Sequence, residues 1–135
     1  MKVIGVWPNT SRLLVKYLTD RTGLDVFSRR PADGWGPHVP CIFVDRLPGP
    51  PSDGFSKTYS FDIEAMAGTV ADLGSLVQDL EVFMFTLPSE SDTTAYVDDV
   101  QCTAEFAEFP LGDVAIERAV ATFDITVRPQ PAPTK

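Results

Sequence analysis

Two acidic residues separated by one position, Asp62 and Glu64, form the pattern in this sequence that comes nearest to a catalytic site. Alternate residues of a strand share one face, so both carboxylates would lie side by side, as in metal-dependent nucleases that hold Mg²⁺. Such sites commonly place a lysine two residues after the second acid, and Met66 stands there. We therefore expect a solvated strand face. A small metal-dependent nuclease using Asp62 and Glu64 remains the alternative from a different functional class.

Few other side chains in the sequence are chemically reactive. His38 is the only histidine and lies in a proline-rich stretch, without a Ser or Cys motif for it to activate. Cys41 and Cys102 lack metal-ligand spacing and fall in strand-like stretches, which favours two buried, reduced thiols. Neither a phosphate-binding glycine loop nor a basic stripe interleaved with aromatics occurs. We expect no enzyme, no cofactor and no metal site.

Length and composition indicate one domain. A chain of 135 residues that is 44% hydrophobic should bury roughly two thirds of its unfolded surface and needs no disulfide to hold its core. No apolar run approaches the roughly 18 to 20 residues of a membrane span, so we expect a soluble protein made in a cytosol, without a membrane partner. The folded domain should cover residues 1–128, and residues 129–135 read as a flexible, proline-punctuated tail.

The stretch from residue 57 to residue 87 predicts a strand that leads into a long amphipathic helix. Apolar residues occupy alternate positions, which is the period of a half-buried strand: Tyr59, Phe61, Ile63 and Ala65. After Gly68, the pair Thr69 and Asp72 resembles a capping box. The helical stripe that follows has spacings of three and four and consists of Leu73, Leu76, Val77, Leu80, Phe83, Met84 and Leu87.

The remaining elements complete an α+β domain with a largely antiparallel or mixed sheet and two helices packed on one face. A first helix should start at Asn9 or Thr10 and end at Gly23. We expect strands at residues 24–28, 41–47 (inside the sheet), 96–109 and 118–128. The strand at 96–109 should place Val100, Cys102, Ala104 and Phe106 on one face. Prolines and glycines predict two irregular loops, at residues 29–40 and 47–54.

Charge is distributed very unevenly along the sequence. Residues 58–117 contain thirteen acids and no Lys or Arg, whereas residues 1–57 contain eight bases and five acids, and residues 118–135 contain three bases and one acid. One interpretation is a solvated acidic face that keeps the protein soluble. The other is a polar subunit whose basic part meets the acidic part of a neighbour, the head-to-tail contact that closes rings.

Several weak motifs in a fixed order give the sequence a family resemblance. They occupy residues 13–21, 25–26, 29–33, 39–46, 61–65 and 118–129. In this layout the chain resembles the tail terminator proteins of long, non-contractile-tailed phages, the siphovirus type, especially those that infect actinobacteria. The likeness covers nearly the whole chain. It departs from the family after Arg46, where members often carry a pair of glycines and this sequence has Leu47, Pro48 and Gly49.

The resemblance implies a non-enzymatic virion protein of the tail or neck, assembled in the host cytoplasm. Tail terminators form a ring, commonly a hexamer, on the last ring of tail tube protein. They stop tube polymerisation and offer the head-completion or connector protein a docking surface, while genomic DNA passes through the lumen without sequence-specific binding. The alternatives are another neck or tail-completion protein and, from a third class, a monomeric binding module.

Candidate interface residues come from the two loops and the basic flanks. Trp35 is either an anchor for a partner or a tryptophan folded back over the core. Proline lowers the entropy that binding must overcome, and loops on a rigid scaffold concentrate contacts. The full set comprises Arg29, Arg30, Trp35, Arg46, Pro50, Arg128, Pro129 and Pro131.

Overall fold

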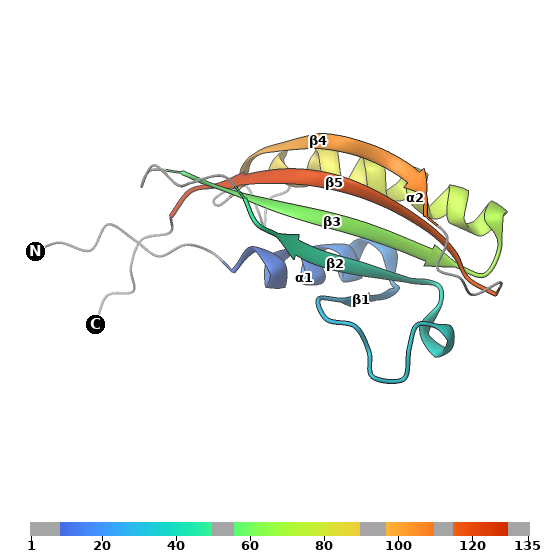
Figure 1. Ribbon diagram of the computed structural model, residues 1–135. Coiled ribbons are helices and arrows are strands. Elements are labelled where there is room, and N and C mark those ends of the chain that lie inside the picture. The colour runs from blue at the N-terminus through green and yellow to red at the C-terminus, as the bar shows by residue number, and fades with distance from the viewer. Residues whose placement is uncertain (1–8, 50–55, 90–96, 110–114, 130–135) are drawn as a thin grey trace, which may run out of the picture.

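The computed structural model describes residues 9–49, 56–89, 97–109 and 115–129, and it shows one curved five-stranded sheet with both helices on the same face (Figure 1). The strand order is β1-β2-β3-β5-β4, with β1 parallel to β2 and every other pair antiparallel. The predicted α+β fold is therefore confirmed. The elements are α1 (Thr10–Thr22), β1 (Asp25–Phe27), η1 (Gly36–His38), β2 (Cys41–Leu47), β3 (Lys57–Ala67), α2 (Val70–Thr86), η2 (Leu87–Ser89), β4 (Val97–Glu108) and β5 (Glu117–Val127).

Both helices begin at the residues that the sequence indicated, and α1 also ends as predicted, whereas α2 ends one residue before the predicted Leu87. The Asn9 side chain accepts a hydrogen bond from the backbone N–H of Arg12 at 3.1 Å, and Gly23 closes α1 in the left-handed conformation with φ 71°. The Thr69 hydroxyl accepts from the N–H of Asp72 at 3.1 Å and so caps α2. α2 ends at Thr86, and a 3₁₀ turn carries the buried Leu87.

The main hydrophobic core lies between the helices and one face of the sheet. Tyr59, Phe61, Ile63 and Ala65 of β3 are all buried there, as predicted. β5 contributes a matching row in which Phe123 lies opposite Phe61, so the two central strands form one apolar surface. The buried members from β5 are Ala119, Ala121, Phe123, Ile125 and Val127.

The edge strand β4 differs from its prediction because it is irregular. Its register against β5 shifts three times, between Val97 and Asp99, between Cys102 and Ala104, and between Ala104 and Ala107. Each extra residue reverses the faces of those that follow. Ala104 consequently pairs with Thr122, which lies on the sheet face without helices, called here the open face, and Ala104 is exposed. Its predicted place on the same face as Cys102 and Phe106 is therefore wrong.

The sheet face without helices carries a smaller apolar cluster under the loop at residues 28–40. Cys41, Phe43, Met66 and Ile116 are buried in it, and Phe27, Trp35 and Val39 pack around them. The loop is irregular except for the three-residue η1 and enters β2 through a cis Val39–Pro40 bond. Because β2 has helices on one side and this cluster on the other, Cys41, Ile42, Phe43 and Val44 are all buried, which confirms its interior position.

The connection after β2 explains the glycine at position 49. A Cβ on Gly49 would lie 2.8 Å from the backbone oxygen of Thr58, so only glycine fits without moving β3. Pro50, Pro131 and the tail beyond Pro129 fall outside the described residues. None of the described helices is both long enough and apolar enough to cross a membrane.

Candidate interface

The acidic pair on β3 is engaged by side chains of β5. The Thr122 hydroxyl donates to Asp62 at 2.6 Å, and the Arg118 guanidinium donates to Glu64 at 3.0 Å. Glu64 is only 6% exposed, so the expected solvated face is wrong at this position. A metal ion would have to displace both donors from these carboxylates. Among the residues that the structure describes, no three His, Cys, Asp or Glu side chains gather as metal ligands would.

Arg118 contacts both Glu64 of β3 and Phe109 at the end of β4 on the open face. Its Nε donates to the carbonyl of Phe109 at 2.8 Å, and its guanidinium lies 5.6 Å from the centre of the Phe109 ring. Burial raises the pKa of Glu64 above its ordinary value, and the charge and hydrogen bond of Arg118 oppose that rise. Arg118 of β5 therefore joins Glu64 of β3 to Phe109 at the end of β4, and it compensates a charge that would otherwise be buried alone.

A ladder of polar pairs continues along the same face of β3 and β5. Ser60 donates to Asp124 at 2.6 Å, and the hydroxyls of Thr58 and Thr126 lie 3.0 Å apart. Sequence reasoning missed these pairs. Polar residues at alternate positions of both strands were the available signal, but assigning partners required the register.

His38 contacts other side chains of the protein, and the two cysteines differ in how deeply they are buried. His38 Nε2 lies 2.9 Å from Asp33 Oδ1, and this contact holds the pKa of the Asp33 carboxyl below its usual range. The His38 ring also packs edge-on against Phe27. Both thiols are free; Cys41 is buried, with its pKa raised to about 11 chiefly by desolvation. Cys102 is only half-buried, contrary to expectation, because the irregular β4 leaves it near the surface.

The structure brings two predicted interface residues together on the open face. Trp35 packs on Phe43 with 5.3 Å between ring centroids and on Phe27 at 5.6 Å, while the Arg30 guanidinium lies 5.5 Å from the Phe43 ring. Trp35 is thus partly buried and covers the smaller apolar cluster of Cys41, Phe43, Met66 and Ile116, the second cluster of the protein. It remains partly accessible at the surface, next to the exposed Arg29 and Arg30.

The other predicted residues lie away from Trp35, where β3 begins and β5 ends. The Arg46 guanidinium lies 4.4 Å from the centroid of the Tyr59 ring. Lys57, which was not among the predicted residues, approaches the same ring at 5.1 Å. Arg128 forms an ion pair with Asp98 of β4. The predicted interface residues therefore lie in two places. Arg29, Arg30 and Trp35 belong to the loop near Phe43, and Arg46 and Arg128 lie near the ends of β2 and β5.

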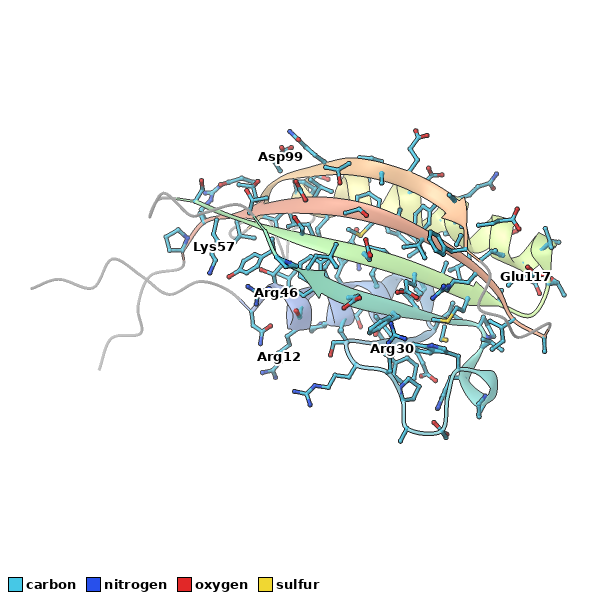
Figure 2. The ribbon with its side chains drawn as sticks, viewed as in Figure 1. Arg12, Arg30, Arg46, Lys57, Asp99 and Glu117 are labelled. Atoms are coloured by element: carbon cyan, nitrogen blue, oxygen red, sulfur yellow. The ribbon has the colours of Figure 1, made fainter. Side chains whose placement is uncertain are left out.

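The two edges of the folded sheet differ in net charge (Figure 2). The described chain from 9 to 49, which forms α1, β1, β2 and their loops, has six bases and four acids. Helix α2 and strand β4, at the other edge, have seven acids and no base. All seven of these acids are exposed: Asp72, Asp79, Glu81, Asp98, Asp99, Glu105 and Glu108. The uneven charge along the sequence is therefore also a separation in space.

Compared with protein-family models and with curated proteins, the sequence matches none of them.

Proposed function

We propose that the protein is a structural subunit of a phage virion, a tail terminator that forms a ring on the finished tail tube. In this role the ring stops tube polymerisation and provides the surface to which the head joins. The observation that carries the proposal is the separation of charge between the two edges of the sheet. An edge that differs in sign from its opposite edge favours a heterologous contact, and heterologous contacts close into rings when the rotation permits.

The geometry of the two edges supports repeated contact in one direction. Arg29 and Arg30 are exposed on the loop at the β1–β2 edge, and Asp99 and Glu105 are exposed on β4 at the other. Like edges would repel and unlike edges would attract, which selects head-to-tail over symmetric pairing. The family resemblance adds to this contact a ring of six subunits around a lumen for genomic DNA.

The site formed by Asp62 and Glu64 supports the structural role over the nuclease alternative. Both carboxylates accept hydrogen bonds from β5, and Arg118 compensates the buried charge of Glu64. These acids therefore join strands to one another. Loss of a Mg²⁺-dependent nuclease activity in Asp62→Ala protein would reverse this conclusion.

A charge-reversal experiment tests the proposal. Tail tubes assembled with the Arg29→Glu/Arg30→Glu variant should be abnormally long and should fail to join heads. The capping of purified tubes by the wild-type chain should weaken as salt rises, because exposed charges are screened beyond about 8 Å at physiological ionic strength. Tail length by electron microscopy and infectious titre are the readouts.

The matched control reverses both edges in one chain. Adding Asp99→Lys/Glu105→Lys to Arg29→Glu/Arg30→Glu restores opposite charges across the contact, so capping should recover. The Asp99→Lys/Glu105→Lys variant alone should fail as the first variant does. Normal tails from either single-edge variant would contradict the electrostatic contact, and a chain that never associates with tubes would contradict the function.

A further inference from the structure

An apolar groove lies between α2 and the end of β4. It has a volume of about 190 Å³, and its walls include Val70, Val77, Phe106, Ala107 and Ala119, with Glu108 at one side. Val70 is 62% exposed although it is a large aliphatic side chain. Because α2 leaves this part of the helix-side face uncovered, the groove offers apolar surface to a second molecule.

One acidic side chain, Glu108, lines the groove, and other acids lie along α2 and β4 beyond it. Cys102 lies four residues before Phe106 and packs on the same core. The charges of Glu81 of α2 and Glu105 of β4 both act to raise the pKa of the Cys102 thiol. Neither α2 nor β4 contains a Lys or Arg. An occupant would therefore be apolar and carry positive charge.

The edge of β4 is a poor template for a regular added strand. Three register shifts displace its backbone groups from an even ladder. A partner would therefore bind at this edge through its side chains. A large aliphatic or aromatic side chain of the partner would enter the groove and anchor the contact.

The sequence that precedes α1 has this chemistry. Residues 2–8 contain Val3, Ile4, Val6 and Trp7 together with Lys2, and contain no acid. We propose that the segment at residues 2–7 of one copy docks in the α2–β4 groove of a second copy, with its apolar side chains in the groove and Lys2 against the acids. This inference rests on the head-to-tail self-association proposed above, but not on the presence of a tail tube.

The segment is too far from the groove of its own chain. The helices run antiparallel, because the Tyr17 hydroxyl donates to the Phe83 carbonyl while Arg21 shares a pocket with Asp72. Asn9 lies eight residues before Tyr17, and Val70 lies thirteen residues before Phe83, so about 30 Å of helix axis separates them. Six extended residues from Asn9 back to Val3 span at most about 20 Å. The groove that the segment can fill belongs to a neighbour.

Disulfide trapping tests the contact with the full chain alone, through a cysteine introduced at Ala107, which lines the groove and is exposed. One population carries Val3→Cys, Ile4→Cys or Val6→Cys together with Cys102→Ser, and the other carries Ala107→Cys with Cys102→Ser and bears a mass tag. They are mixed at the highest soluble concentration and oxidised with copper phenanthroline. At least one position should give a covalent heterodimer, read on a non-reducing gel and by mass spectrometry. Absence of a heterodimer at every position would overturn the proposal.

Two exposed valines of α2 supply a matched control. Val70 lines the groove and is 62% exposed, whereas Val82 is 60% exposed and is not among the groove residues. Val70→Arg in the tagged chain should slow trapping at least tenfold, and Val82→Arg should change it less than twofold. Equal effects would overturn the assignment to this groove, as would an internal disulfide in a chain that carries both Val6→Cys and Ala107→Cys.

The outcomes separate this inference from the proposed function. Failure of trapping in a chain that still caps tail tubes would overturn the docked segment and leave the terminator role. Trapping in a chain that does not cap tubes would establish the contact between copies and overturn the role.

Discussion

The two faces of the sheet are stabilised by different interactions, although the same two strands provide most of both. On the helix side, β3 and β5 present an apolar row that α1 and α2 cover. On the open side, the same strands present hydroxyls, carboxylates and one arginine that pair across the ladder. Burial of apolar side chains on the helix side is favourable and needs no particular direction of contact. Polar groups on the open side stabilise the fold only when each has a hydrogen-bond partner.

Because of this difference, the helix face mainly stabilises the fold, and the open face presents the candidate interface residues. The helix face can supply most of the free energy of folding, because burial of apolar area is the dominant favourable term. The open face adds smaller contributions and keeps Arg30 and Trp35 at the surface. Substitutions at neighbouring positions of β5 should therefore differ sharply in effect, according to the face on which the side chain lies.

The largest effect should come from Phe123→Ala. Phe123 is fully buried and its ring contacts those of Phe85 and Phe106. The cavity and the lost apolar burial should lower the free energy of unfolding by about 3–5 kcal/mol. Urea denaturation measures it, and Thr122→Val, one residue away on the open face, is the matched control with a loss of about 1 kcal/mol. Equal losses would remove the distinction between the faces.

Arg118→Met should have the next largest effect, and that effect should depend on pH. The variant leaves the buried Glu64 carboxylate without its cation, at a cost of about 2–4 kcal/mol near pH 7. Burial already raises the pKa of Glu64, and loss of Arg118 should raise that pKa further. A carboxyl group with a higher pKa in the folded chain favours folding below that pKa and opposes it as pH rises through it.

The free energy lost by Arg118→Met should consequently be smaller at pH 4 than at pH 7, when both proteins are measured by urea denaturation. Adding Glu64→Gln to Arg118→Met should recover part of the loss at pH 7, because no buried charge remains. Arg46→Met is the exposed control and should cost less than about 1 kcal/mol at either pH. A pH-independent loss would show that Arg118 acts through packing alone.

The helix face was predictable from sequence because its signal is local. Alternation with a period of two placed Phe61 and Ile63 in the core, and spacings of three and four placed Leu73 and Leu80 opposite them. The caps at Asn9, Gly23 and Thr69 depend on residues within one turn of the helix. Such features need no knowledge of distant contacts.

The open face and the edge were not predictable in the same way, because they depend on register. Glu64 was expected to be solvated, and only the pairing of β3 with β5 shows that Arg118 reaches it. The irregularities of β4 have no local sequence signature, so alternation failed at Ala104. The groove beside Val70 likewise arises from how far α2 extends over the sheet, which no single segment encodes.

Trp35→Ala should have an intermediate effect, because it removes a partly buried ring from the small cluster. The expected loss is about 1–2 kcal/mol by urea denaturation, less than for Phe123→Ala. Cys41 belongs to the same cluster, so its reaction with a thiol reagent should also become faster, and Cys102 provides the internal reference on the other face. Unfolding of the whole domain by Trp35→Ala would show that the second cluster matters as much as the main core.

The smallest effect should come from Ser60→Ala on the open face. The hydroxyl donates to Asp124 at 2.6 Å, but both residues are partly exposed, so water can replace the lost donor. The expected loss is about 0.5–1 kcal/mol by urea denaturation. A double-mutant cycle with Asp124→Asn measures the coupling between the two side chains and separates it from effects on either strand alone. A coupling energy comparable to the loss in Phe123→Ala would mean that the polar ladder, like the apolar core, determines whether β3 and β5 stay paired.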